Sequence, residues 1–150
     1  MIHKIPVSVL VVVHTADLQV LLLERADRPG FWQSVTGSQD PGETLVRTAQ
    51  RELAEETGIA ADPEQLINWN RQNCFEIYPH WRDRYAPGVT HNTEHVFGLT
   101  LPAAQDVLLA PREHVAWRWL PWREAADRVF SWSNAEAIRE LPQRIAKLGR

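Results

Sequence analysis

Three carboxylates on one short segment carry the strongest chemical signal in this sequence. Glu52, Glu55 and Glu56 lie in the stretch 44–57, which is predicted to be a helix that ends at Gly58. At about 100° per residue, Glu52 and Glu56 lie about 40° apart and Glu55 about 60° to the other side. Two such charges about 5 Å apart repel by about 3 kcal/mol at an effective dielectric of about 20. The helix therefore favours either proton uptake or a bound cation, and oxygen ligands suit Mg²⁺ or Mn²⁺.

The negative charge of the chain is concentrated in the same region. Residues 37–59 hold five Asp or Glu and two Arg, so their net charge of -3 equals that of the whole chain. A plainer interpretation is a solvated acidic helix face, on which Arg47 and Arg51 act as i,i+4 partners of the acidic side chains. The spacing of the whole segment decides between these interpretations.

That spacing follows a longer pattern. Gly37 is followed after five residues by Glu43, and after seven more by the run Arg51-Glu52-Leu53-Ala54-Glu55-Glu56-Thr57-Gly58-Ile59. The pattern resembles the complete Nudix box of the Nudix hydrolases. Seven fixed residues, each at a frequency of roughly one in fifteen, would coincide at a given position with a probability on the order of 10⁻⁸. The sequence is therefore identified as a member of that family.

The resemblance implies both a fold and an activity. The fold is α/β, a Nudix-like α/β/α sandwich with a mixed β-sheet and a loop-helix-loop catalytic motif, and residues 1–150 form a single Nudix hydrolase domain. The activity is hydrolysis of a nucleoside diphosphate linked to another group, with Mg²⁺ as the cofactor and Mn²⁺ as a substitute. The residues implied for catalysis and metal binding are Glu52, Glu55 and Glu56, and those that support the motif are Gly37, Glu43, Arg51 and Gly58.

The chemistry of such a site matches these residue types. A polyphosphate is highly anionic, so water attacks phosphorus only where that charge is shielded and the water is activated. Bound Mg²⁺ can bridge phosphate oxygens and lower the pKa of a coordinated water, and a carboxylate can accept the water's proton. No Ser, Cys or His nucleophile is required, so the single cysteine, Cys74, is expected to be a packed residue.

Segments outside the box resemble one branch of the family, which acts in folate biosynthesis. These segments are 4–8, 31–38, 82–90, 92–94, 113–114 and 131–134. The resemblance implies hydrolysis of 7,8-dihydroneopterin 3′-triphosphate to the monophosphate and pyrophosphate. A second hypothesis is a broad (deoxy)nucleoside triphosphate pyrophosphohydrolase, because purine and pterin share a fused, hydrogen-bonding bicycle. A third is a ligand sensor without hydrolysis, although a sensor has no need to hold three repelling carboxylates.

The same resemblance nominates residues beyond the box. Glu113 is implied to be a further catalytic metal ligand that reaches the box helix from a distant loop. Lys4 and Arg25 suit triphosphate oxygens, and Phe75 or Tyr78 could stack on a pteridine. The residues expected to contact substrate are Lys4, Arg25, Thr36, Phe75, Glu76, Ile77, Tyr78 and Ser131.

Each of these assignments has a plainer alternative. Arg25 could form a surface ion pair with Glu24 or Asp27, and Phe75 could be ordinary core packing. The Pro- and Gly-rich segment 80–90 is either a recognition loop or solvated. Among the seven Trp, Trp32 could stack on a substrate ring, and core packing is expected for the others.

The composition suits one globular domain and excludes other classes. An apolar fraction of 44% and a charged fraction of 23% are ordinary for 150 residues, and a single cysteine excludes an internal disulfide framework and a Cys-based zinc site. The longest apolar run, 9–13, is too short to span a bilayer. A net charge of -3 provides no general basic field for nucleic acid. We therefore expect a cytoplasmic enzyme whose partner is a small-molecule pteridine or nucleoside triphosphate, with no nucleic acid, membrane or protein partner evident.

Hydrophobic patterning predicts the elements that must position the site. Strands are expected at 7–13, 20–25, 32–36, 66–73, 75–78, 95–101 and 117–120. A small helical stretch should begin at Pro121, and residues 133–148 should form a final helix that Pro142 bends. Strands on either side of one strong helix, followed by a helix at the end, favour a mixed sheet covered on both faces.

Overall fold

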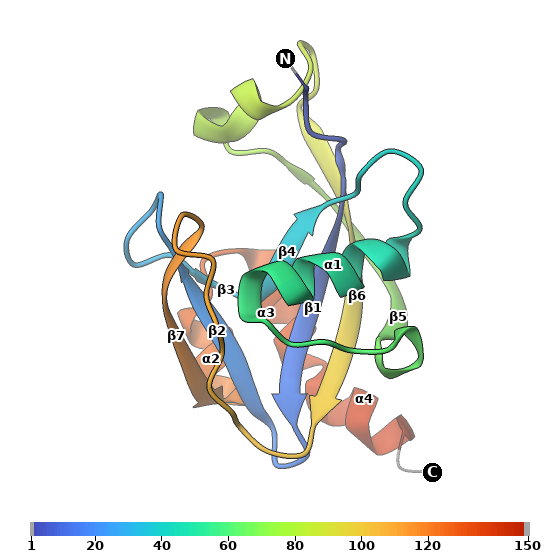
Figure 1. Ribbon diagram of the computed structural model, residues 1–150, viewed down its shortest axis with the longest axis vertical. Coiled ribbons are helices and arrows are strands. Elements are labelled where there is room, and N and C mark those ends of the chain that lie inside the picture. The colour runs from blue at the N-terminus through green and yellow to red at the C-terminus, as the bar shows by residue number, and fades with distance from the viewer. Residues whose placement is uncertain (1, 149–150) are drawn as a thin grey trace.

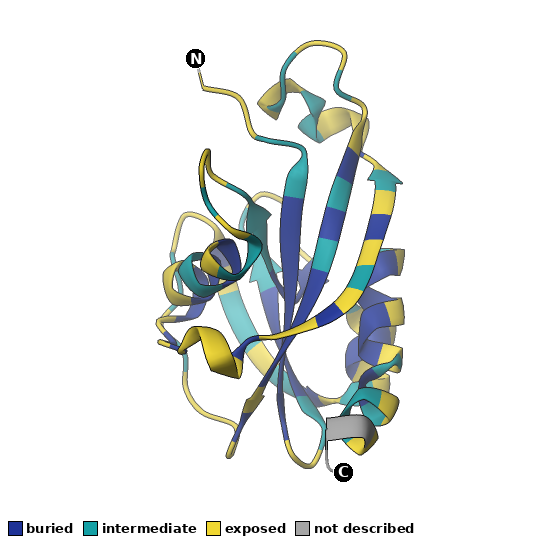
Figure 2. Cartoon of the chain, turned by 90° about the vertical axis from the view of Figure 1, so that its right-hand side faces the viewer, coloured by how far each residue is buried: buried dark blue, intermediate teal, exposed yellow. Residues whose placement is uncertain are grey.

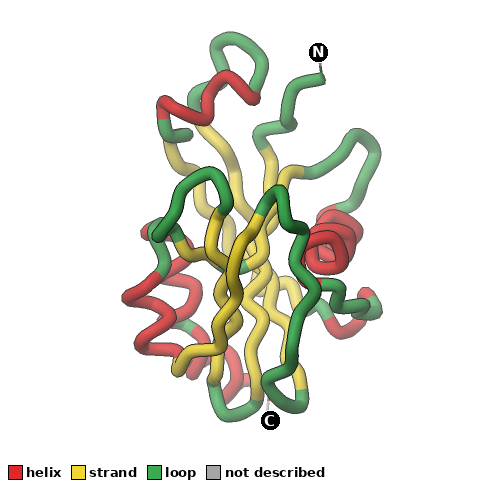
Figure 3. Tube along the Cα trace, turned by 60° about the vertical axis from the view of Figure 1, so that its left-hand side comes forward, coloured by secondary structure: helices red, strands yellow, loops and turns green. Residues whose placement is uncertain are grey.

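The protein has three layers in the computed structural model, which describes residues 2–148. A mixed β-sheet separates α1 (Leu45–Thr57) from α2 (Trp122–Arg128), α3 (Trp132–Arg139) and α4 (Leu141–Leu148), which lie on the opposite face (Figure 1). Figure 3 shows the same division from another side, with helices on both sides of the strands. The predicted α/β/α sandwich is confirmed.

The sheet formed by the described residues has seven strands. Their order is β3-β2-β1-β6-β5, with β4 also paired to β1 and β7 paired to β2. β1 and β6 run parallel over nine paired positions, and the other pairs are antiparallel. The strands are β1 (Val7–Thr15), β2 (Gln19–Arg25), β3 (Trp32–Gln33), β4 (Val35–Ser38), β5 (Ile67–Glu76), β6 (His91–Leu101) and β7 (His114–Pro121).

The central strand β1 is buried on both faces. Val9 and Val11 pack in the cluster that includes the α1 side chains, whereas Leu10 and Val12 pack in the cluster that includes α3. A strand covered on both sides needs apolar residues at successive positions, which explains the unbroken β-branched run. Figure 2 shows buried central strands between helices whose outer faces are exposed.

The helix α1 begins and ends as its sequence predicts. The Thr44 hydroxyl accepts a hydrogen bond from the Arg47 backbone N–H, and Gly58 takes a left-handed conformation (φ 74°) in which its N–H donates to the Ala54 carbonyl. Ala49 and Leu53 are fully buried against the sheet. This packing fixes the rotation of the helix and therefore the direction of its carboxylates.

The predicted strand 32–36 is divided into β3 and β4 at Ser34. β3 pairs with β2, whereas β4 pairs with β1, so the chain changes neighbours at this point. The side chain of Asn134, at the start of α3, accepts from the Ser34 backbone N–H at 2.8 Å and donates to the Ser34 hydroxyl at 3.0 Å. These bonds replace the ladder partners that Ser34 lacks where the chain crosses between strands.

The predicted final helix 133–148 is two helices, α3 and α4. The break falls at Glu140, whose N–H is shared between the carbonyls of Glu136 and Ala137. Pro142 lacks an N–H and is tolerated only in the first turn of a helix, so α4 starts anew at Leu141 instead of continuing α3. The expected bend is therefore a break.

Four other elements differ from the prediction. The expected strands 66–73 and 75–78 form the single strand β5, which absorbs a register shift through Asn70 in a left-handed conformation (φ 55°). β6 and β7 begin earlier than expected, at His91 and His114. Part of the segment expected to be a loop forms the 3₁₀ helix η2 (Pro79–Arg84).

Two burial expectations were wrong. Cys74 is exposed because β5 lies at the end of the strand order and turns alternate residues to solvent. Trp32 packs in the core at 8% exposure, whereas Trp132, expected in the core, is 54% exposed beside the cavity described below. No helix formed by residues 2–148 combines the length and apolar character needed to cross a membrane.

Candidate active site

One cavity of about 760 Å³ gathers most of the predicted site residues. Segments that line it come from the N-terminus, β4, one edge of α1, the end of β5, η2 and the start of α3. All eight predicted substrate-contacting residues line it, as do Glu52, Glu56 and Glu113. Glu55 instead lines a second, smaller hollow together with Glu113. A cavity of this volume suits a small-molecule ligand.

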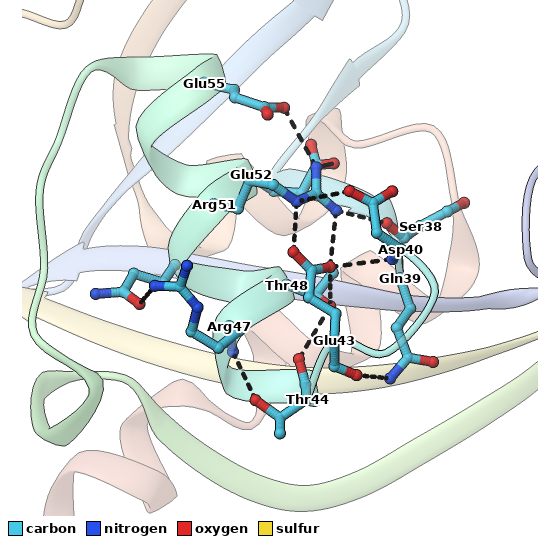
Figure 4. A network of polar contacts seen from close by, with 11 residues as sticks. Ser38, Gln39, Asp40, Glu43, Thr44, Arg47, Thr48, Arg51, Glu52 and Glu55 are labelled. Atoms are coloured by element: carbon cyan, nitrogen blue, oxygen red, sulfur yellow. Dashed lines mark hydrogen bonds and ion pairs between the residues drawn. The ribbon is translucent and has the colours of Figure 1, made fainter.

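Arg51 connects the loop before α1 to the acidic helix face (Figure 4). Its guanidinium donates to both carboxylate oxygens of Glu43, at 2.7 and 3.0 Å, and to the Ser38 carbonyl at 2.9 Å. It also donates to Glu52 at 2.7 Å and reaches Glu55 at 3.4 Å. The hydrogen bonds from Arg51 hold the pKa of Glu43 at about 2, below its usual 4.5. The predicted supporting pair is therefore a clasp that fixes the loop against the helix.

Gly37 leaves room for the carboxylate of Glu52. A Cβ built on Gly37 would overlap the Glu52 carboxylate, so a side chain at this position would displace it. Gly37 pairs with Val9 across β1 and β4, which anchors its backbone in the sheet. The first glycine of the box is required here for close approach, not for unusual backbone angles. Gly58, by contrast, serves as the left-handed cap of the helix.

Glu52 and Glu56 point inward and are poorly solvated. Their residues are 9% and 2% exposed, and burial raises the pKa of both carboxyls. A hydrogen bond with Glu52 and the charges of Glu52 and Glu113 raise the pKa of Glu56 further. Among residues 2–148, the Oε1 atom of Glu56 has no hydrogen-bond partner. Two buried carboxyls in contact create a strong demand for a proton or a cation.

The remaining carboxylates are less enclosed. The Glu55 side chain is half exposed and lies at the edge of the site, and Glu113 faces both hollows. Within the described part of the chain, no three acidic or histidine side chains are already drawn together as a metal cluster. The donor set still fits a hard divalent cation, because it contains only carboxylate oxygens and includes an unpartnered buried one. Such open arrays suit Mg²⁺, which usually keeps several of its waters.

Two cationic side chains face the same cavity. Burial, followed by the charge of Arg84, lowers the pKa of Lys4. Arg25 donates to both oxygens of Asp27 at 2.8 and 2.9 Å, so the ion pair considered as its alternative role is formed. The Arg25 guanidinium also lies 4.3 Å from the ring centre of Trp81 and still lines the cavity. The pair therefore orients Arg25 and does not remove it from the site.

An aromatic group, of which the sequence singled out only Tyr78, covers part of the cavity. Tyr78 and Trp81 are stacked at 5.4 Å with nearly parallel rings, and Phe130 meets both rings edge-on. Trp81 lies on η2, in the segment for which the sequence left recognition and solvation open. The sequence offered only the aromatic side chain of Trp81 as an indication that it lines the cavity. Phe130 is distant in the sequence, so its contact with Trp81 could not be inferred from spacing.

Other predicted contacts already have structural roles. The Thr36 hydroxyl donates to the Val9 carbonyl at 2.9 Å, and the Ser131 hydroxyl caps α3 by accepting from the Asn134 N–H. The Ile77 carbonyl accepts from Arg82, and Glu76 pairs with the same guanidinium. Phe75 is half-buried at the cavity wall. These residues shape the cavity through bonds that are in place without a ligand.

Comparison with known proteins agrees with this geometry. The family model described as the NUDIX domain matches residues 4–141. The chain belongs to the NUDIX family. This NUDIX chain is 48% identical over 143 residues to the dihydroneopterin triphosphate diphosphatase of Escherichia coli (strain K12), which covers 93% of this chain and 94% of that protein. The protein of the same name from Haemophilus influenzae is 41% identical over 136 residues, covering 89% of this chain and 85% of that protein.

A solved structure shares the fold of the NUDIX chain. The structure of the Escherichia coli dihydroneopterin triphosphate pyrophosphohydrolase aligns with a TM-score of 0.87 and 48% identity. The alignment covers 93% of this chain and 97% of that one. The family assignment made from the box therefore extends over almost the entire described chain.

A methyl group at position 37 should damage the site without unfolding the protein. We expect Gly37→Ala to lower Mn²⁺ affinity by about 10-fold or more, because the Glu52 carboxylate must move. Gly98→Ala is the matched control, since its Cβ would overlap Trp69 in the core. That control should lower the melting temperature and leave Mn²⁺ affinity unchanged. Calorimetric titration that finds wild-type affinity in Gly37→Ala would contradict the role given to Gly37.

The clasp between Glu43 and Arg51 should make a pH-dependent contribution to stability. The pKa of Glu43 is about 2 in the folded protein and usually 4.5, so the contribution is complete above about pH 5 and is lost as pH falls toward 2. We expect Glu43→Gln to reduce the free energy of unfolding by about 1–2 kcal/mol at pH 6. Urea titrations should show a smaller difference from wild type at pH 3.5. A difference that does not change with pH would refute this assignment.

Proposed function

We propose that this NUDIX chain hydrolyses 7,8-dihydroneopterin 3′-triphosphate to the monophosphate and pyrophosphate, with Mg²⁺ as the cofactor. The observation that carries the proposal is a single cavity that joins the buried carboxylates of the box to Lys4, Arg25 and a group of aromatic rings. Such a cavity suits a ligand with a polyphosphate at one end and a flat heterocycle at the other. The diphosphatases that are 48% and 41% identical support the choice of substrate.

The acidic wall of the cavity would hold the cofactor. Glu52, Glu56 and Glu113 face the cavity and would supply oxygen ligands, with Glu55 joining from its edge. When bound there, Mg²⁺ supplies charge shielding to the phosphates and lowers the pKa of a coordinated water. One carboxylate of this set accepts the proton of the attacking water. Arg51 keeps the ligand face in place through its bonds to Glu43 and Glu52.

The cationic wall would orient the substrate. Arg25 is held rigid by Asp27 and the Trp81 ring, so little conformational freedom is lost when its guanidinium meets a phosphate. Lys4 adds a second charge from the N-terminal segment. η2, with Tyr78 just before it, limits the access of water on the aromatic side. These residues bind and orient the substrate, and the carboxylates complete the reaction.

Glu56→Gln should lower turnover by about 100-fold or more, because it removes a charged group from the centre of the ligand set. The fold should persist, since the amide has nearly the same shape and a buried charge is removed. Glu64→Gln, on the exposed helix η1 (Pro63–Gln65), is the control and should retain full activity. The turnover rate with Mg²⁺ and the thermal unfolding temperature should be measured for wild type and for both variants. Near-normal Mg²⁺-dependent turnover in Glu56→Gln would exclude Glu56 from catalysis.

The substrate itself can be tested with a panel in ¹⁸O-labelled water. We expect a higher kcat/KM for dihydroneopterin triphosphate than for dATP or dGTP, with pyrophosphate and the monophosphate as products. The position of the label identifies the phosphorus that water attacks. A higher kcat/KM for a nucleotide would favour a broad pyrophosphohydrolase, and binding without turnover would favour a sensor.

A further inference from the structure

A line of polar side chains crosses the cavity wall from Arg25 to Glu56. The Arg25 guanidinium donates to the Gln33 carbonyl oxygen at 3.1 Å, and the Gln33 amide nitrogen lies 3.2 Å from Nε2 of His114. The same Nε2 atom lies 3.9 Å from Oε1 of Glu56. Gln33 and His114 are each 4% exposed, and all four residues line the cavity. Neither Gln33 nor His114 belongs to the Nudix box or to the substrate contacts expected from the sequence.

The ends of three strands bring these side chains together. Gln33 lies on β3, which pairs with β2. Arg25, at the end of β2, pairs with His114, at the start of β7, where the register of the two strands shifts. The Ala26 backbone N–H also donates to the Glu113 carbonyl at 2.9 Å. Backbone pairing therefore holds Gln33 between its two partners, and one of these partners directly follows a candidate metal ligand.

The chemical types of these groups determine the direction of each hydrogen bond. A guanidinium is only a donor, so the Gln33 atom that faces Arg25 must be the carbonyl oxygen. The amide NH₂ group then faces His114, and because it can only donate, Nε2 must accept with its lone pair. Turning the amide over would place its NH₂ group against the guanidinium, donor against donor. Arg25 thus determines, through Gln33, that the imidazole carries its proton on Nδ1.

The other ring nitrogen does not alter this choice. Within residues 2–148, Nδ1 of His114 has no hydrogen-bond partner, so it is unpaired whether or not it carries the proton. Nε2 is the ring nitrogen that a hydrogen bond holds, and that bond requires a lone pair there.

The form of His114 matters because Nε2 faces the unpartnered Oε1 atom of Glu56. A lone pair at Nε2 offers this oxygen no hydrogen, so the oxygen stays available to a cation. An N–H group at the same position could turn toward Oε1 and donate to the carboxylate, and such charge-assisted bonds are stronger than neutral ones. A cation would then have to displace that bond before it could bind Glu56.

We propose that Gln33 is a positioning residue that joins Arg25 to His114 and keeps a nitrogen without a proton facing Glu56. Its effect is to leave Oε1 of Glu56 free for a divalent cation. The inference rests on the proposed function, in which Glu56 is a metal ligand and Arg25 meets phosphate. It adds a direct connection between the residues that bind phosphate and those that bind metal.

Nitrogen-15 spectra of histidine-labelled, metal-free protein report the tautomer, because ring nitrogens with and without a proton give well-separated signals. In wild type, Nε2 of His114 should be the nitrogen without a proton. Gln33→Met has a side chain of similar length without the amide and should move the proton toward Nε2. His114→Asn identifies the signals, and Gln72→Met, exposed on β5, is the matched control. A proton on Nε2 in wild type would overturn the proposal.

Calorimetric titration with Mn²⁺ alone measures the consequence without substrate. Gln33→Met should weaken Mn²⁺ binding by about 10-fold, the effect of one hydrogen bond to a charged group. Gln72→Met should leave the affinity within about 2-fold of wild type. When Gln33→Met is added to His114→Asn, we expect no further loss, because the nitrogen through which Gln33 acts is already absent.

The outcomes separate the alternatives. If Gln33→Met costs the same affinity with and without His114→Asn, Gln33 only supports the fold and the proposal is wrong. Unchanged Mn²⁺ affinity in Gln33→Met would also overturn it. If Gln33→Met does not fold, the wild-type spectrum decides. Absence of dihydroneopterin triphosphate hydrolysis, with the spectra and Mn²⁺ affinities as expected, would refute the proposed function alone.

Discussion

The site depends on the guanidinium of Arg51, whose single positive charge is smaller than the total negative charge of the carboxylates around it. Arg51 bonds the two oxygens of Glu43 and the Ser38 carbonyl, and it contacts Glu52 and Glu55 from the same group. Glu56 lies beyond its reach in the described contacts and is the most deeply buried of the box carboxylates. Arg51 therefore fixes the geometry of the acidic helix and leaves an excess of negative charge at the cavity. A site built in this way is complete only with a further cation.

The local parts of this arrangement could be predicted from the sequence. Helix ends, the apolar stripe of Ala49 and Leu53, and the cluster of glutamates depend on spacing within about four turns of helix. The resemblance of residues 37–59 to the Nudix box then predicted the α/β/α fold in which these residues lie. The path of β1 through the core was also predictable, because a β-branched run of that length reads as a strand buried on both faces.

Features that depend on distant partners could not be predicted in this way. The break at Ser34 is stabilised by Asn134, one hundred residues later in the chain. The exposure of Cys74 follows from the position of β5 in the strand order, which no local pattern encodes. The aromatic group at the cavity brings Tyr78 and Trp81 against Phe130, which is distant from both in the sequence. Hydrophobic periodicity identifies elements, whereas the contacts between elements create cavities.

The anchoring of η2 has a consequence for how the cavity admits a ligand. Asp27 accepts hydrogen bonds from both Arg25 and Arg84, and the Trp81 ring of η2 lies over the Arg25 guanidinium. Moving η2 outward would separate Arg84 from Asp27 and deprive Arg25 of its aromatic cover in the same displacement. The position of η2 at the cavity and the orientation of the Arg25 guanidinium are thus mechanically linked. A mutation that loosens one must also disturb the other.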